Sequence, residues 1–351
     1  MRNNTSIADI RPVNHQLSQT AYDTPRQIAA HFGAMQAQDF NSVKWAIGAR
    51  LNGCTEKTVQ ESFDKGELLR THILRPTWHL VTPENIRWMQ QLSVKQIIQS
   101  MKSRDRDLGL TDEIFSKCYR IIEIAMVNEE QLTKEELTAI LHNANMKFDS
   151  SQMYHVLTEA EANGIICSGA LRAKEHTYAL LEKRVPVAKP LTKEESLAKL
   201  ARIYFTGHGP AVLSDFVWWS GLPVSEARQG LQAVQAEFIS ETIDGQTYWM
   251  PDTDFQPPAG KSEVHLLPAF DEYIVGYKDR AAILTSENHQ KAISSNGVFR
   301  PVIVKDGKVI GLWKKAASRK KTITVAPFEP VNHETQQLID AAAEKFRAFD
   351  G

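Results

Sequence analysis

The stretch TEKTVQESFDKGELLRTHILRPTWHLV, residues 55–81, predicts one helix followed by two strands. Val59 and Phe63 are four residues apart, so they share one face of a helix over residues 55–66. Residues 68–72 and 77–81 are rich in β-branched, aromatic and aliphatic side chains, and Pro76 separates the two pieces. We therefore expect this stretch to form a helix and a β-hairpin.

Two further helices are predicted before this stretch. Thr24 can cap a helix, Pro25 suits its first turn, and Gln27 completes a capping box, so a helix is expected to about Phe32. Another helical run covers residues 42–51. Three helices followed by a hairpin is the order of elements in a winged-helix unit.

The same order recurs twice more along the chain. In the second copy, capping residues Thr133 and Glu136 start one of three helices, and strands are expected at residues 165–167 and 177–181. In the third copy, Thr192 and Glu195 make the same capping box, and a hairpin turns at Asp244-Gly245. Because identity between the copies is faint, the repeat is inferred from the order of elements and from the local signals.

After a Pro-rich linker at residues 252–260, the remaining chain is mostly strand-like and ends in a helix over residues 334–348. We therefore expect an α+β protein with three tandem winged-helix units, a small C-terminal β-sheet or barrel, and a terminal helix. The expected boundaries are residues 1–100, 101–190 and 191–251 for the three units, and residues 260–351 for the C-terminal region.

Composition excludes several classes of protein. The chain has 351 residues, of which 42% are hydrophobic and 24% are charged, as in ordinary globular proteins. It has no long apolar stretch and no signal-peptide pattern near Met1, so we expect a cytoplasmic protein without a membrane partner. The three cysteines lie far apart and predict no zinc site. With a net charge of −1, any binding of nucleic acid must use local basic patches.

The segment Gly33-Ala34-Met35-Gln36-Ala37-Gln38-Asp39 places two carboxamides and a carboxylate within four residues. One interpretation is structural, because polar residues near a helix end commonly cap backbone groups or face solvent. The other depends on spacing: on an extended chain, Gln36 and Gln38 project to the same side and could together hold one water molecule.

This segment and several others make the chain similar to a known family, the winged-helix DNA glycosylases of the AlkZ and YcaQ type, which are winged-helix DNA-binding-domain proteins. The resemblance covers most of the chain and runs through the following segments: residues 33–39, 44–48, 70–79, 204–211, 215–222 and 266–273. The catalytic motif of that family is Gln, an apolar residue, then Gln or Asp. Gln36-Ala37-Gln38 matches the first form, so the resemblance implies that Gln36 and Gln38 are catalytic.

The resemblance implies a bacterial hydrolase of DNA repair that releases bulky N-alkylated purines, including crosslinked ones, by hydrolysing the N-glycosidic bond. It implies no metal and no cofactor. Alkylation of a ring nitrogen makes the base a good leaving group, so the enzyme needs mainly to stabilise a sugar cation and position water. Carboxamide oxygens can do both. The implied partner is double-stranded DNA, alkylated or crosslinked, bound by a monomer.

Several other residues are candidates for DNA contact, each with a structural alternative. On the first hairpin, the alternating residues Arg70, His72, Arg75 and His79 either line a DNA cleft or form the polar side of an exposed hairpin. The basic residues nearer the C-terminus either bind phosphates or are solvated surface; they are Lys278, Arg280, Lys314, Lys315, Arg319, Lys320 and Lys321. Remaining candidates are favoured as structural: His208 to shape a turn, and Tyr178, Tyr248, Trp218, Trp219 and Trp249 as core residues.

Two hypotheses from different classes remain. The first is a metal-independent DNA glycosylase that acts on alkylated bases. The alternative is a non-catalytic winged-helix DNA-binding protein or transcriptional regulator, which would select an operator sequence and usually bind as a dimer. The two differ in one observable, the release of free base from alkylated DNA.

Overall fold

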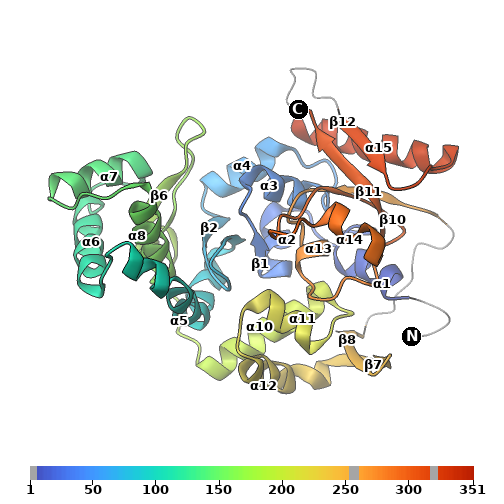
Figure 1. The fold of residues 1–351 in the computed structure, drawn as a ribbon, viewed down its shortest axis with the longest axis horizontal. Helices are drawn as coiled ribbons and strands as arrows, with labels where there is room; N and C mark the ends of the chain where they lie inside the picture. Colours follow the sequence, from blue (N-terminus) through green and yellow to red (C-terminus); the bar gives the residue numbers. More distant parts are fainter. Residues whose placement is uncertain (1–5, 253–260, 317–322) are drawn as a thin grey trace.

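The computed structural model describes residues 6–252, 261–316 and 323–351. The described chain is a mixture of helices and short antiparallel sheets (Figure 1). Helices α6, α7 and α8 form a module at one end, and the N-terminal and C-terminal segments lie together at the other. A third group, around α10, α11 and α12, lies below them in this view.

The first group of elements follows a short N-terminal helix, α1 (Ile7–Asn14). Its elements are α2 (Pro25–Phe32), β1 (Ala34–Gln36), α3 (Phe40–Gly48), α4 (Glu56–Asp64), β2 (Leu69–His72) and β3 (Trp78–Val81). The capping box predicted at Thr24 and Gln27 is confirmed, because the Thr24 hydroxyl accepts a hydrogen bond from the Gln27 backbone N–H at 3.3 Å. The three strands pair in the order β1-β3-β2, so β3 is the central strand.

A long helix, α5 (Pro83–Asp107), leads from this group to the next and was not predicted. Its 25 residues include the buried side chains of Trp88, Met89, Leu92 and Ile97. The start signal was present in the sequence, since Thr82 precedes a proline at the first helical position.

The second group has its own hydrophobic core, which includes Cys118, Leu137, Val156 and Ile166. Its elements are α6 (Asp112–Ala125), β4 (Leu132–Thr133), α7 (Lys134–Asn143), α8 (Ser150–Ala162), β5 (Ile166–Ser168) and β6 (Thr177–Leu180), and a short helix α9 (Leu181–Arg184) follows. The strands pair in the order β4-β6-β5, which repeats the pattern of the first sheet.

The third group repeats the order of helices and ends in a two-stranded sheet. Its elements are α10 (Lys193–His208), α11 (Leu213–Ser220), α12 (Val224–Val234), the 3-10 turn η1 (Gln235–Glu237), β7 (Phe238–Ile243) and β8 (Gln246–Pro251). Ala211 pairs with Trp249 as an isolated bridge, in the place that β1 and β4 take in the other groups. The predicted turn is confirmed: Asp244 and Gly245 both have positive φ, as a two-residue hairpin turn requires.

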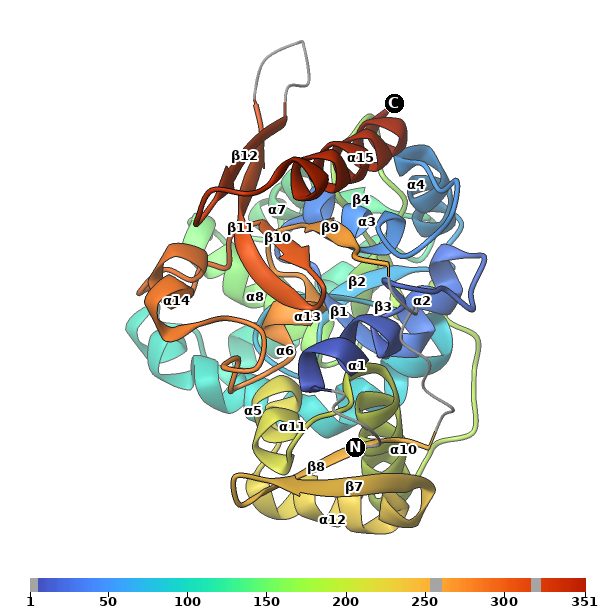
Figure 2. The same ribbon diagram turned by 90° about the vertical axis from the view of Figure 1, so that its right-hand side faces the viewer.

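The C-terminal region forms a four-stranded antiparallel sheet covered by a long helix (Figure 2). Its elements are β9 (Val264–Leu267), α13 (Glu272–Val275), α14 (Ser286–Ala292), β10 (Val302–Lys305), β11 (Lys308–Lys315), β12 (Ile323–Pro327) and α15 (His333–Asp350). This region shares one core with the first group, where the Trp45 and Phe346 rings lie 5.0 Å apart. The two ends of the chain therefore pack together and hold the segment that contains Gln36 and Gln38.

Candidate active site

The segment Gln36-Ala37-Gln38 lies at the end of β1, an edge strand of the first sheet. Gln36 is the last residue of β1 and pairs with His79 of β3. The pairing continues past the strand, because the Ala37 backbone N–H donates to the Trp78 carbonyl at 2.7 Å. The backbone is thus extended through Ala37, which is the geometry that directs the side chains of residues 36 and 38 to one side.

The two carboxamides have different surroundings. Gln36 is 8% exposed, and its Oε1 accepts a hydrogen bond from Arg75 Nη2 at 3.2 Å. Gln38 is exposed, and its carboxamide has no hydrogen-bond partner within the described chain. The helix cap here is Asp39, whose Oδ1 accepts from the Asn41 and Ser42 backbone N–H groups. Asp39 therefore caps the helix, which is the structural role considered for this segment. The Gln38 carboxamide remains available to a ligand.

Side chains distant in sequence hold the backbone of this segment. Arg70 Nε donates to the Ala37 carbonyl at 2.9 Å and Arg70 Nη2 to the Gln38 carbonyl at 3.4 Å. On the other side, the Gln36 backbone N–H donates to Glu272 Oε1 at 2.8 Å. The position of the two glutamines therefore depends on β2 and α13 as well as on β1.

A cleft of about 1240 Å³ opens beside Gln38. It lies between the first group, the β5–β6 hairpin of the second group and the C-terminal region. Its aromatic lining residues are Phe40, Trp45, Trp78, Trp313, Phe346 and Phe349, and its basic ones are Lys44, Arg70, Lys174 and Lys315. Its acidic lining residues are Asp39, Glu56, Asp64 and Asp350. Exposed rings and unpaired cations on a concave surface suit nucleobases and phosphates respectively.

The four candidates on the first hairpin do not share one exposed face. His79 is completely buried, and burial lowers its pKa well below the usual range. His72 is 1% exposed, and its Nδ1 lies in hydrogen-bond contact with the Glu161 carboxylate. Because β3 is a central strand and β2 packs against α8 and β5, this hairpin lies inside the molecule. The expectation that His72 and His79 contact DNA is therefore wrong for this structure.

The two arginines of the hairpin lie next to the segment Gln36-Ala37-Gln38. Arg70 lines the cleft and stacks on Trp78, with its guanidinium carbon 4.2 Å from the ring centroid. Burial lowers the pKa of Arg70, and also that of Arg75. Both therefore act on the backbone or side chain of residues 36–38 in this structure.

The basic candidates near the C-terminus are spread over separate places. Lys278 and Lys314 are exposed, whereas Lys315 lines the cleft and forms an ion pair with Asp350. Arg280 is largely buried over the Phe299 ring, 5.1 Å from its centroid, and burial lowers its pKa to about 10. The remaining three, Arg319, Lys320 and Lys321, lie outside the described residues.

Trp218 and His208 were expected to have structural roles, and their surroundings differ from that expectation. Trp219 is fully buried as expected, but its neighbour Trp218 is 41% exposed. His208 does not only shape a turn: it is buried, stacks on Tyr204 at 4.6 Å between ring centroids, and places Nε2 3.2 Å from Glu272 Oε2.

The acidic pair Asp271 and Glu272 is not among the site residues predicted from the sequence. Asp271 forms a buried double hydrogen bond with Arg50, at 2.8 Å from Nη1 and 2.7 Å from Nη2, and Glu272 holds the Gln36 backbone. A signal was available, because two adjacent acids stand in the otherwise apolar run LLPAFDEYIV, residues 266–275. Acidic residues in such a run are expected to be buried and paired.

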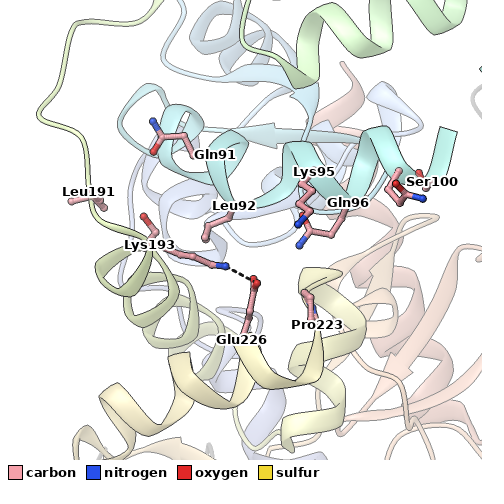
Figure 3. A pocket seen from close by; sticks show the side chains of 11 residues that line it. Gln91, Leu92, Lys95, Gln96, Ser100, Leu191, Lys193, Pro223 and Glu226 are labelled. Atoms are coloured by element: carbon pink, nitrogen blue, oxygen red, sulfur yellow. Dashed lines mark hydrogen bonds and ion pairs between the residues drawn. The ribbon is translucent and has the colours of Figure 1, made fainter. Parts of the chain in front are cut away.

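A second cleft, of about 590 Å³, lies between α5 and the helices α10 and α12 (Figure 3). An ion pair between Lys193 of α10 and Glu226 of α12 lies at its edge. None of the predicted site residues lines this cleft, so it is separate from the site around Gln38.

Two searches of residues 6–252, 261–316 and 323–351 gave negative results. No group of three or more His, Cys, Asp or Glu side chains there could hold a metal ion. No helix in these ranges is long and apolar enough to span a membrane.

The cleft thus brings aromatic rings, basic side chains and the Gln38 carboxamide together. Residues 29–349 match the family described as DNA glycosylase AlkZ-like, so the chain belongs to the AlkZ-like DNA glycosylase family. As a member of this family it is a DNA repair enzyme that cleaves the glycosidic bond between a base and its sugar.

A curated protein and a solved structure, both from Streptomyces sahachiroi, are similar to the chain. The chain is 23% identical to a curated "Interstrand DNA cross-link repair glycosylase" over 330 residues, which are 89% of this chain and 85% of the relative. A solved structure, "Streptomyces sahachiroi DNA glycosylase AlkZ", superimposes with a TM-score of 0.82 over 97% of this chain and 95% of the other, at 19% identity. This structural likeness shows a shared fold.

Proposed function

We propose that the chain hydrolyses the N-glycosidic bond of bulky N-alkylated purines in duplex DNA, with Gln36 and Gln38 as its catalytic residues. One observation carries the proposal: the Gln38 carboxamide is free at the edge of a large cleft, on a backbone that side chains hold on both sides. A carboxamide in that position can bind the attacking water or the sugar without first breaking another contact.

The reaction needs little proton transfer at the base. An N7-alkylated purine is cationic, so it leaves as a neutral base with the electron pair of the glycosidic bond. Positive charge then forms on the sugar, and carboxamide oxygens aimed at it stabilise the transition state more than the ground state. Arg75 Nη2 orients the Gln36 oxygen in the structure described here, while Gln38 is free to position water.

The size of the cleft supports a bulky substrate. Pockets for small ligands measure roughly 300–1,000 Å³, and the cleft beside Gln38 is larger, at about 1240 Å³. The curated relative is named for interstrand crosslink repair, which agrees with a substrate larger than a single methylated base. We therefore include crosslinked purines among the substrates.

The arrangement of elements supports binding of a duplex by three winged-helix units. In each group three helices precede a hairpin, and a strand or bridge between the first two helices pairs with that hairpin. We retain the proposed boundaries of residues 1–100, 101–190 and 191–251 for these units and 260–351 for the C-terminal region. We propose that one chain binds the duplex as a monomer in the cytoplasm, with Lys174, Lys278, Lys314 and Lys315 near the phosphates.

A direct test is base release from three duplexes: one with a single N7-methylguanine, one with a bulky N7 adduct, and one with an N7 crosslink. We expect free modified base and an abasic site from the adducted duplexes and none from unmodified DNA, as measured by mass spectrometry. Release from the methylated duplex alone would remove bulky substrates from the proposal. A protein that releases no base but enriches one sequence from a random duplex pool would be a regulator.

A further inference from the structure

A buried carboxylate lies directly behind the catalytic strand. Glu272 Oε1 accepts from the Gln36 backbone N–H at 2.8 Å, and Glu272 Oε2 is 3.0 Å from Trp219 Nε1 and 3.2 Å from His208 Nε2. The residue is 1% exposed. Burial of an acid this deep is costly unless its charged form is fully hydrogen-bonded, as it is here.

No arginine or lysine of the described chain forms a direct ion pair with Glu272. Its nearest titratable partner is His208, whose Nδ1 is buried without a hydrogen-bond partner. The tautomer with its proton on Nε2 lets the ring donate to Glu272 Oε2. Both Glu272 oxygens therefore face N–H donors: the Gln36 backbone on one side, and Trp219 Nε1 and His208 Nε2 on the other.

The neighbouring residue fixes the carboxylate in place. Asp271 is the N-cap of α13 and pairs with Arg50, which follows α3. Glu272 thus contacts Gln36 of β1, and Asp271 contacts Arg50, which follows α3. Neither acid can relax far from its position during the reaction.

We propose that Glu272 is a positioning residue of the glycosylase reaction, which fixes Gln36 and places a negative charge behind it to stabilise the cationic sugar. This inference rests on the proposed function. In the reaction, the glycosidic bond breaks with its electron pair going to the base, water forms the new C1′–O bond, and its proton passes to solvent. Gln36 and Gln38 are neutral and the neighbouring Arg75 is basic, so Glu272 is the acidic group that would oppose the sugar cation.

The charge can be measured without turnover by comparing two abasic-site analogues in duplex DNA. A pyrrolidine nucleotide carries a positive charge where the sugar cation forms, whereas a tetrahydrofuran nucleotide is neutral and of similar shape. We expect wild type to bind the pyrrolidine duplex more tightly. Because a charge several ångströms away acts through an effective dielectric constant of about 20, we expect Glu272→Gln to lower this preference on the order of tenfold.

The matched control is Glu161→Gln. Glu161 is another buried acid paired with a histidine, His72, but it has no hydrogen bond to residues 36–38. We expect this variant to keep the wild-type preference for the pyrrolidine duplex. An equal loss in both variants would show a general effect of replacing a buried acid and would overturn the inference.

The remaining outcomes separate this inference from the proposed function. If wild type prefers the pyrrolidine duplex and Glu272→Gln keeps that preference, Glu272 has no electrostatic role. If wild type shows no preference and releases no base, the proposed function itself fails. Should Glu272→Gln not fold, Glu272→Asp keeps the charge: a preference near that of wild type supports the inference, and a preference abolished in a folded protein contradicts it.

Discussion

Alanine at Gln36 or at Gln38 is expected to lower the single-turnover rate of base excision by roughly 10²–10³, by analogy with the loss of one preorganised hydrogen-bonding group in other active sites. Affinity for the alkylated duplex should change little. The reason is that a carboxamide which orients water or faces the sugar cation acts mainly in the transition state. Rates come from quenched time courses at saturating protein, and affinities from fluorescence anisotropy with the same duplex.

Substitutions that keep an oxygen at position 38 refine this prediction. Gln38→Asp recreates the other form of the family motif and should retain activity, whereas Gln38→Glu has a longer acidic side chain and need not. The Gln38 carboxamide has no hydrogen-bond partner in the described chain, so Gln38→Ala should not unfold the protein. If either alanine variant excises base at the wild-type rate, that glutamine is not catalytic.

Asp271→Ala is expected to lower the free energy of unfolding by about 3–5 kcal/mol, the usual cost of removing one partner from a buried ion pair. Asp271 and Arg50 both have side chains with 0% exposure, and the substitution leaves the Arg50 guanidinium without its carboxylate. Urea unfolding followed by circular dichroism measures the loss. The same variant should also loosen α13 and so weaken the hold on Gln36.

The control for this prediction is an exposed ion pair of similar geometry. Arg202 and Glu237 form two hydrogen bonds at 2.6 and 2.7 Å on the surface. Exposed pairs contribute about 0–1 kcal/mol, so Glu237→Gln should have a small effect. A loss for Asp271→Ala no larger than that of Glu237→Gln would show that the buried pair does not fasten the C-terminal region to α3.

Local signals made much of the secondary structure predictable. Capping boxes at Thr24, Thr133 and Thr192 depend on residues three apart in the chain, and all three are present in the structure. The turn at Asp244-Gly245 depends on two residues alone. Because capping boxes and two-residue turns need no tertiary contact, they can be predicted from the sequence.

Burial of the first hairpin was not predictable in the same way. The alternation of Arg70 and His72 is typical of a strand with one exposed face. Strand β1 has only three residues, too few to show a pattern, yet its pairing makes β3 central and places His79 in the interior. The role of that hairpin follows from packing between distant segments.

The candidate site also has residues that local sequence predicts and residues that only tertiary packing reveals. Gln36 and Gln38 could be selected from one short segment and from the resemblance that surrounds it. Glu272 could not, because its contact with Gln36 joins residues 236 positions apart. The arrangement behind the catalytic strand becomes visible only when the C-terminal region is packed against the first group of elements.

The central claim, that Gln36 and Gln38 drive the release of a damaged base, is tested most directly by one time course. Wild type and the Gln36→Ala/Gln38→Ala double variant are each incubated at saturating concentration with a duplex that carries one bulky N7-alkylguanine, and free base is measured by mass spectrometry. We predict that wild type releases the base while the double variant, bound to the same duplex, releases it only at the spontaneous rate. Equal rates for the two proteins, or no release above the spontaneous rate by wild type, would contradict the claim.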